Sequence, residues 1–295
     1  MACKNIFTFH NHLNKLRREQ KWFQNWLLEG YSLRQLHNIS GHSIRTHKRI
    51  NAYWLALTPP SLKLSFANFK YLISDGTYFH HENCIYTIID ALSGLILSYQ
   101  FERAENYALA REAFSTLKKA GCEPTAITLD GNKPVLKALQ DVWPNIIVQR
   151  CLYHILRQGT SWLRRFPKDP AARALRDIIL TVTTISDLTL KELFLKHFVL
   201  WEQTYGTYTQ SLDGHHKVWS DLQKARSLII NALPNMFHYL DDPKIAFTSN
   251  KQEGLFSIVK ILFRNHRGVK KANRENYFRW YFYFKNKKNT NYFGY

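Results

Sequence analysis

The pattern of hydrophobic positions indicates helices near the start of the chain. Within residues 18–55, as in "WFQNWLLEG", apolar side chains recur every three or four positions. Gly30 predicts the end of the first helix, and Ser32 and Ser43 stand where a hydroxyl can cap two further helices. Three helices joined by short breaks are therefore expected.

From about residue 70 to 150 the pattern changes to short β-prone runs. "YLIS", "IYTIID" and "LILSYQF" predict three strands, and the turn "DALSG" joins the last two as an antiparallel hairpin. A helix over 106–120, the strand "TAITL", a helix over 134–141 and the strand "NIIVQ" follow. This order predicts an α/β fold.

A long region after these strands returns to helical spacing. Residues 155–245 predict an all-helical insertion. A further helix follows, which Ser249 or Asn250 can cap. Its expected buried stripe comprises Leu255, Ile258, Val259 and Leu262.

Two aspartates follow predicted strands directly. Asp75 comes after "YLIS" and Asp130 after "TAITL", each with a glycine behind it. Parallel pairing of these strands, which the helical crossover permits, would bring the two carboxylates together at one sheet edge. Paired carboxylates repel unless a divalent cation bridges them, and such oxygen ligands suit Mg²⁺ or Mn²⁺. The alternative interpretation is that Asp-Gly simply forms a turn.

Two other acidic residues bear on this prediction. Glu253 lies in the first turn of the helix after residue 249, where the helix dipole alone already favours a carboxylate. Asp90 also follows a strand, but "IDALSG" places it in a hairpin turn at the opposite end of the sheet from Asp75. We therefore assign Asp90 to structure.

Composition and charge indicate a globular chain with a polyanionic partner. The 295 residues are 45% hydrophobic, enough for about two domains. Lys and Arg number 41 against 22 Asp and Glu, a formal charge of +19 that favours nucleic acid over a solvated basic surface. No long apolar run or signal core occurs, so we expect a cytoplasmic protein that does not bind membranes.

The third predicted helix has the character of a DNA-recognition helix. Ile44 and Ile50 can face inward while basic side chains face outward, as in a helix-turn-helix. The alternative is a plain helical bundle with a basic solvent face. The candidate DNA-binding residues are Arg45, His47, Lys48 and Arg49.

Four stretches in a fixed order resemble one family. They are "DGTY" at Asp75, "ITLDGN" at Asp130, "WPNIIVQRCLYHILR" with Cys151 and His154, and "TSNKQEGLFSIVK" followed by "RNHRG". Together they resemble DDE transposases with an RNase H-like core, specifically bacterial insertion-sequence transposases close to the mutator-like group.

The resemblance implies a function and a site. Asp75, Asp130 and Glu253 would form the catalytic, metal-binding triad, with two Mg²⁺ (or Mn²⁺) ions as cofactors. The reaction would be DNA cleavage and strand transfer. The partners would be the element's terminal inverted repeats and target double-stranded DNA, bound by a homo-oligomer associated with the bacterial nucleoid.

Several other residues receive roles beside this triad. Arg264, His266 and Arg267 are placed to hold DNA phosphates, unless they form a solvated face. Cys151 and His154 could supply half of a zinc site, but no second pair is convincing among Cys84, Cys122, His215 and His216. We therefore expect that Cys151 and His154 shape the active site.

The expected organisation has five segments. They are a basic N-terminal remnant 1–17, a helix-turn-helix region 18–58, a first part of the RNase H-like core 68–154, the helical insertion 155–245, and a last core part with a basic tail 246–295. Related proteins often begin with a zinc ribbon, and Cys3 in "ACKNIFTFH" looks like the end of one. A non-transposing RNase H-like nuclease and a DNA-binding regulator with an inactive core remain alternatives.

Overall fold

The computed structural model describes residues 9–79, 83–266 and 268–293, which fall into two compact units. The first unit joins residues 1–64 to residues 255–295, and the second comprises residues 65–254. The expected last segment 246–295 is therefore divided between the units. Cys3, which suggested a zinc ribbon, lies outside the described residues.

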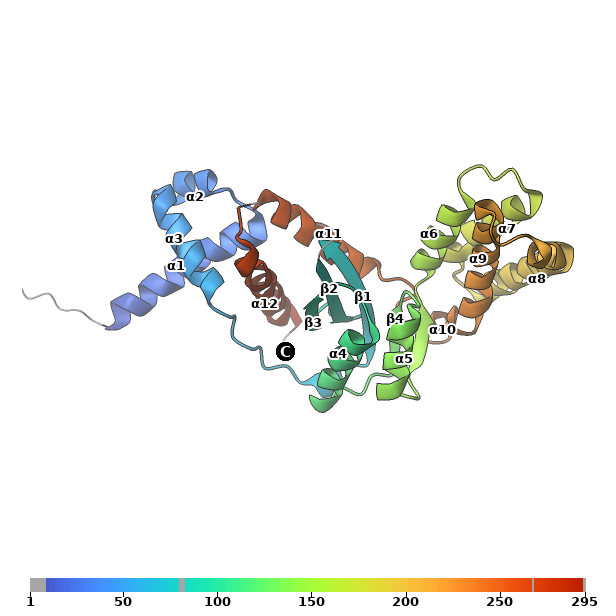
Figure 1. The fold of residues 1–295 in the computed structure, drawn as a ribbon. Helices are drawn as coiled ribbons and strands as arrows, with labels where there is room; N and C mark the ends of the chain where they lie inside the picture. The colour runs from blue at the N-terminus through green and yellow to red at the C-terminus, as the bar shows by residue number, and fades with distance from the viewer. Residues whose placement is uncertain (1–8, 80–82, 267, 294–295) are drawn as a thin grey trace, which may run out of the picture. The chain divides into compact units, whose positions relative to one another are not determined.

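Four complete α-helices and the larger part of α11 (Asn250–Asn265) build the first unit (Figure 1). The complete helices are α1 (Phe9–Glu29), α2 (Leu33–Ser40), α3 (Ile44–Ala56) and α12 (Arg274–Phe293), with the short 3₁₀ turn η4 (Lys271–Asn273) before α12. Because α1 begins at Phe9, the boundary expected after residue 17 falls inside a helix.

Local capping interactions define the ends of these helices as the sequence indicates. Gly30, which follows α1, has a φ of 70°. The Ser32 side chain accepts from the Gln35 backbone while the Gln35 side chain accepts from the Ser32 backbone, a reciprocal capping box that begins α2. Ser43 accepts from the Thr46 backbone at the start of α3.

Aromatic side chains form the core of the first unit. Phe23 stacks on Trp54, and Trp280 meets both rings edge-on. The indole nitrogen of Trp280 donates to the carbonyls of Trp54 and Leu57, each at 2.8 Å. The C-terminal segment is thus a packed helix, not the basic tail that the charge pattern suggested, because its aromatic residues are buried.

Two expected inward-facing isoleucines lie on the surface. Ile50 of α3 is buried, but Ile44 is 41% exposed because it occupies the first turn of the helix. On α11 (Asn250–Asn265), Leu255, Val259 and Leu262 are buried as expected, whereas Ile258 is 48% exposed.

A mixed five-stranded sheet forms the centre of the second unit, confirming the predicted α/β class. Its order is β3-β2-β1-β4-β5, with antiparallel pairing among the first three and parallel pairing of β1 with β4 and β4 with β5. The strands are β1 (Tyr71–Phe79), β2 (Asn83–Asp90), β3 (Ile96–Glu102), β4 (Ala126–Leu129) and β5 (Ile147–Arg150). The helices between them are α4 (Tyr107–Lys119) and α5 (Lys133–Val142), and η1 (Phe66–Asn68) precedes β1.

The first strand does not end at Asp75, contrary to the prediction. β1 continues to Phe79 because it stays paired with β2, and Asp75 itself lies opposite Thr87. The parallel pairing with β4, in contrast, ends at Ile73 opposite Thr128. Continuing that register places Asp75 level with Asp130, so the expected proximity of the two aspartates follows from where the parallel ladder stops.

The expected insertion is helical throughout its regular elements. It comprises α6 (Leu152–Leu163), α7 (Pro170–Leu180), η2 (Val182–Thr184), α8 (Leu188–Ser211), α9 (Lys217–Ala232), η3 (Leu233–Asn235) and α10 (His238–Asp241). Buried residues such as Leu175, Trp201 and Ile229 form one continuous core through these helices. No helix among the described residues is long and apolar enough to span a membrane.

The segment after α10 returns along the parallel side of the sheet. The Tyr71 hydroxyl donates to Asp242 at 2.6 Å, the Thr128 hydroxyl donates to the Ala246 carbonyl, and the Leu152 amide donates to the Phe247 carbonyl at 2.9 Å. These bonds hold the segment before α11 along the parallel strands, so that α11 begins near their carboxyl ends.

Candidate active site

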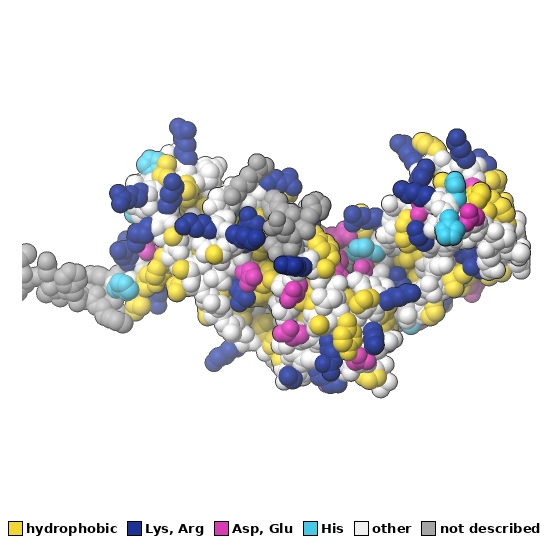
Figure 2. All heavy atoms as spheres, in the orientation of Figure 1, with side chains coloured by type: hydrophobic (Ala, Val, Ile, Leu, Met, Phe, Trp, Pro, Cys, Tyr) yellow, Lys and Arg dark blue, Asp and Glu magenta, His cyan; other side chains and the backbone are white. Residues whose placement is uncertain are grey.

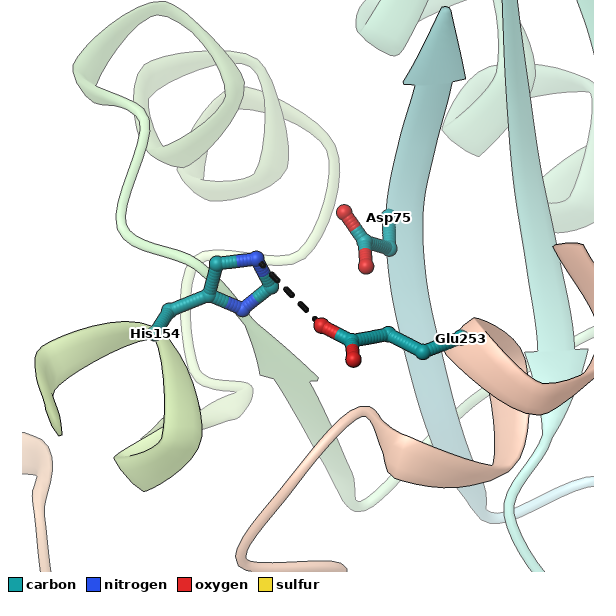
Figure 3. Close-up of side chains that lie close together, drawn as sticks. All are labelled: Asp75, His154 and Glu253. Carbon is teal, nitrogen blue, oxygen red and sulfur yellow. Dashed lines mark ion pairs between the residues drawn. The ribbon is translucent and has the colours of Figure 1, made fainter. Parts of the chain in front are cut away.

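Three side chains from separate elements converge where the parallel pairing of β1 with β4 ends. Asp75 comes from β1, His154 from the first turn of α6, and Glu253 from the first turn of α11, and they point toward one another (Figure 3). Their metal-ligating atoms all lie within 4.8 Å of one another. Asp75 is buried, whereas the side chains of His154 and Glu253 remain 24% and 31% exposed. The cluster is therefore open to solvent on one side.

The environment of Asp75 opposes its ionisation when no cation is bound. Burial is the largest influence and raises the pKa of Asp75 to about 6; His154 opposes this rise, while the charges of Asp130 and Glu253 add to it. The Gly76 amide donates to the carboxylate at 2.8 Å. A cation beside Asp75 would relieve this unfavourable charge.

Glu253 is fixed by its neighbour Gln252, which is fully buried under the start of α11. The Gln252 amide nitrogen donates to the carbonyls of Asp75 at 3.2 Å and Thr87 at 2.8 Å, and to the Thr87 hydroxyl. One turn of α11 is thereby bound to both β1 and β2, and Glu253 is presented toward Asp75.

A lysine adds a second connection between α11 and the hairpin. The ammonium of Lys251 donates to the carbonyls of Ala91 at 2.7 Å and Leu92 at 2.8 Å. Asp90, in the same hairpin, accepts from the amide and hydroxyl of Ser93, both at 2.6 Å. These bonds give Asp90 the turn-forming role that the sequence suggested.

Asp130 lies next to the cluster but outside the group of three. It follows β4 directly, and its carboxylate accepts from the Asn132 amide at 2.9 Å. The Arg150 guanidinium donates to the Asp130 carbonyl at 2.9 Å. The charge of Asp130 contributes to the raised pKa of Asp75.

His154 belongs to a buried network with Cys151 and Ser249. The Ser249 amide donates to the Cys151 sulfur at 3.2 Å, and the Ser249 hydroxyl lies 3.4 Å from both Cys151 Sγ and His154 Nδ1. Burial lowers the pKa of His154, but the hydrogen bond and charge of Cys151, with Asp75 and Asp130, raise it to about 9. Cys151 occupies the position before the first residue of α6, makes no side-chain capping bond there, and is absent from the metal-ligating group. Ser249 thus connects Cys151 and His154, a contact that sequence spacing did not reveal.

Glu105 is a further carboxylate that the sequence analysis did not identify. A Cβ atom built on Gly76 would lie 2.0 Å from the Glu105 carboxylate oxygen. Burial, followed by the charges of Asp130 and Asp75, raises the pKa of Glu105 to about 7. Its position in a loop before α4 carries no strand or helix signal, so only the folded sheet brings it to the site.

The predicted DNA-binding residues of α3 have different environments. Arg45 and Lys48 are exposed. Arg49 is also exposed at 57%, but its guanidinium forms an ion pair with Glu19 at 2.7 Å. His47 is fully buried, and its Nε2 lies 2.8 Å from the Ser40 hydroxyl. Direct DNA contact is therefore not supported for His47, because its ring packs inside the unit.

The three residues expected to bind phosphates at the end of α11 also have different environments. Arg264 is exposed, as that role requires. His266 is buried, and its Nε2 donates to the Trp26 carbonyl at 2.8 Å. This placement gives His266 a packing role instead of a phosphate contact. Arg267 lies outside the described residues.

The donor set of the cluster fits a divalent cation. Two carboxylates and one imidazole have ligand atoms within 4.8 Å of one another, and oxygen and imidazole ligands bind divalent metals such as Mg²⁺, Mn²⁺ and Zn²⁺. The chemistry that such a site supports is the activation of water or hydroxyl groups and the stabilisation of charge on phosphate oxygens.

Comparison with known proteins identifies relatives of the chain. Residues 87–222 match the family described as "Transposase, Mutator family". This match includes Asp130 and His154 but neither Asp75 nor Glu253. The predicted resemblance to insertion-sequence transposases of the Mutator family is thereby confirmed.

Individual proteins that are similar to part of the chain are also described as transposases. A "Probable transposase for insertion sequence element ISRM3-like" from Sinorhizobium fredii is 29% identical over 117 residues, 39% of this chain and 29% of that protein. A "Probable transposase for insertion sequence element" from Corynebacterium diphtheriae is 26% identical over 109 residues, 36% of this chain and 32% of that protein. The matched region therefore spans about a third of these relatives.

Part of the chain also matches a solved structure. It is the cryo-EM structure of a simian T-cell lymphotropic virus intasome in complex with the PP2A regulatory subunit B56 gamma. The match covers 57% of this chain and 70% of the other at 13% identity, with a TM-score of 0.24. A score this low supports no conclusion about a shared fold.

Proposed function

We propose that the protein is a DNA transposase of an insertion sequence, with an RNase H-like core that cleaves and joins DNA by metal-dependent phosphoryl transfer. The observation that carries the proposal is the convergence of Asp75 and Glu253 within 4.8 Å at the end of the parallel β1–β4 pairing, with Asp130 level in register. The family match and the sheet order β3-β2-β1-β4-β5 support it.

In this proposal the carboxylates hold the cations and the chain orients the phosphate. Asp75, Asp130 and Glu253 are the ligands, and Mg²⁺ or Mn²⁺, when bound, would activate water or a DNA 3′-hydroxyl and stabilise the leaving oxygen. The rigid attachment of α11 to the sheet through Gln252 keeps Glu253 aimed at Asp75. Such positioning is needed because a small displacement of a ligand weakens catalysis.

The basic surface supplies the DNA-binding part of the proposal. Figure 2 shows Lys and Arg side chains distributed over the N-terminal helices and over the helical insertion. Arg45 and Lys48 on α3, which follows a three-residue turn after α2, are the best placed for a helix-turn-helix contact. The substrates are then the terminal inverted repeats and a target duplex, bound by an oligomer that brings two ends together.

A strand-transfer assay tests this proposal. Duplex oligonucleotides carry the terminal inverted repeat, read from the DNA that flanks the coding sequence, and cleaved and joined products are resolved on gels with Mg²⁺ or Mn²⁺. We expect Asp75→Asn, Asp130→Asn and Glu253→Gln each to reduce cleavage and joining by on the order of 100-fold or more while DNA affinity is kept. Asp177→Asn, which alters an exposed carboxylate on α7, is the matched control.

The results of this assay distinguish a transposase from a nuclease and from a DNA-binding regulator. Normal cleavage by Glu253→Gln would contradict the assignment of the triad. Cleavage without joining would favour a non-transposing nuclease, and DNA binding without metal-dependent cleavage would favour a regulator.

A further inference from the structure

His154 Nε2 and Glu253 Oε1 face each other as an ion pair when the imidazole is protonated, with no hydrogen bond between them (Figure 3). The gap between His154 Nε2 and Glu253 Oε1 is 3.9 Å, too long for a hydrogen bond. A cation with ligand distances of about 2.1 Å can span at most about 4.2 Å between two of its ligand atoms. The pair is therefore separated by a distance that one bound cation would fill.

The third member of the cluster completes such a coordination site. Asp75 offers a carboxylate oxygen within 4.8 Å of both other ligand atoms, and small side-chain rotations would remove the excess over the span of a single ion. Figure 3 shows the three side chains converging from three different elements. Asp130, which the sequence favoured as a ligand, is not a member of this group.

The other side of the imidazole ring is held as in known metal-binding histidines. In metal sites the non-ligating ring nitrogen is usually hydrogen-bonded, which fixes the ring and directs the second nitrogen at the metal. Here Nδ1 lies 3.4 Å from the Ser249 hydroxyl, and Ser249 is itself buried and bonded to Cys151. The network leaves Nε2 directed into the cluster.

From this geometry we infer that His154 Nε2 is a direct ligand of the cation held by Asp75 and Glu253, and that this nitrogen makes the site prefer Mn²⁺ to Mg²⁺. The inference rests on the proposed metal-dependent function. Mg²⁺ favours ligand sets made wholly of oxygen, whereas imidazole nitrogen suits transition metals. In this arrangement Ser249 is a positioning residue that acts through His154.

Electron paramagnetic resonance of Mn²⁺ tests the inference on the full-length protein without relying on activity. Electron spin echo envelope modulation detects a ¹⁴N nucleus bound to Mn²⁺, and labelling histidine with ¹⁵N changes the modulation if the ligand is a histidine. We expect a ¹⁴N signal in the wild-type protein that is replaced on labelling. This measurement stays valid even if a variant fails to fold.

Variants then assign the nitrogen to a residue. His154→Asn should abolish the ¹⁴N signal, weaken Mn²⁺ binding at least about tenfold and reduce the preference for Mn²⁺ over Mg²⁺ measured by competition. Ser249→Ala should keep the signal but weaken Mn²⁺ binding, because the ring loses its support. His197→Asn, an exposed histidine of α8, should change nothing.

The results distinguish failure of this inference from failure of the proposed function. Mn²⁺ that binds and is lost in Asp75→Asn, but shows no ¹⁴N signal in the wild type, would overturn ligation by His154 and leave the carboxylate site intact. A signal that persists in folded His154→Asn would overturn it too. Absence of any Mn²⁺ binding sensitive to Asp75→Asn would contradict both.

Discussion

Two histidines in the first unit, His47 and His266, are buried, and burial lowers the pKa of each. The Ser40 hydroxyl donates to the Leu36 carbonyl, so it accepts from His47 Nε2, and His47 Nδ1 is buried without a hydrogen-bond partner. Burial, together with the charge of His42, lowers the pKa of His47. Burial also lowers the pKa of His266, whose ring lies 4.2 Å from that of Trp26. Both rings therefore resist protonation in the folded chain.

Acid should therefore destabilise the first unit. Below the ordinary histidine pKa of about 6.5, the unfolded chain binds protons that the folded chain does not, so stability falls as the pH drops. Each histidine can contribute a loss of up to about 1.4 kcal/mol per pH unit until its lowered folded pKa is reached. Thermal unfolding between pH 7.5 and 5 measures the effect.

The histidine variants provide the control for this prediction. His47→Gln and His266→Gln should each flatten the dependence on pH, whereas replacement of the exposed His197 should leave it unchanged. If stability depended equally on pH in all three variants, the buried histidines would not be the cause of the acid destabilisation.

At the scale of elements, the hydrogen bonds of Gln252 connect α11 to the sheet. Its amide nitrogen bonds the carbonyls of both Asp75 and Thr87, groups that belong to the paired strands β1 and β2. Removal of one partner from a buried hydrogen bond leaves the other group unsatisfied, which costs more than the net gain of forming the bond. Gln252 is thus the buried connection that holds the start of α11, and with it Glu253, against the sheet, beside the more exposed connection through Lys251.

Replacing Gln252 should affect both stability and the metal site. We expect Gln252→Ala to lower the free energy of unfolding by about 1–3 kcal/mol, since buried carbonyls lose their donor, and to weaken Mn²⁺ binding because Glu253 loses its support. Urea denaturation and Mn²⁺ titration measure the two effects. Gln210→Ala, at an exposed position of α8, is the matched control, and equal behaviour of both variants would contradict the role of Gln252.

For the whole molecule, the charge of +19 predicts binding to a polyanion, which is DNA in the proposed function. Each phosphate that a basic side chain neutralises releases condensed counterions, so affinity falls steeply as salt concentration rises. Several basic residues lie outside α3, and only part of the salt dependence can come from that helix. The contribution of α3 is measurable as a change in the slope of log K against log salt.

Neutralising the free basic residues of α3 should change this slope by a defined amount. We expect the double variant Arg45→Ala and Lys48→Ala to reduce the slope of log K against log salt by roughly 2, about 0.9 for each lost phosphate contact. Lys287→Ala, at an exposed position of α12, should have a smaller effect. Fluorescence anisotropy with a labelled duplex measures the slopes, and an unchanged slope would assign α3 to a structural role.

Much of the fold is determined by interactions that are local in sequence. Gly30 ends α1, and Ser32 and Ser43 begin the next helices, because caps require only neighbouring backbone groups. The order of strands and helices likewise followed from the periodicity of apolar positions. The sequence also indicated that Asp75 and Asp130 would be neighbours, since parallel strands align their carboxyl ends.

The candidate site itself was decided by contacts between distant segments. Asp75 lies in the middle of a strand, because pairing with β2 overrides the turn signal of Asp-Gly. Glu105 approaches Gly76, and His154 replaces Asp130 in the tightest cluster, only because separate elements meet at one sheet edge. Burial likewise removed His47 from the DNA-binding candidates. Local patterns specify which elements form, whereas long-range packing determines which side chains face one another.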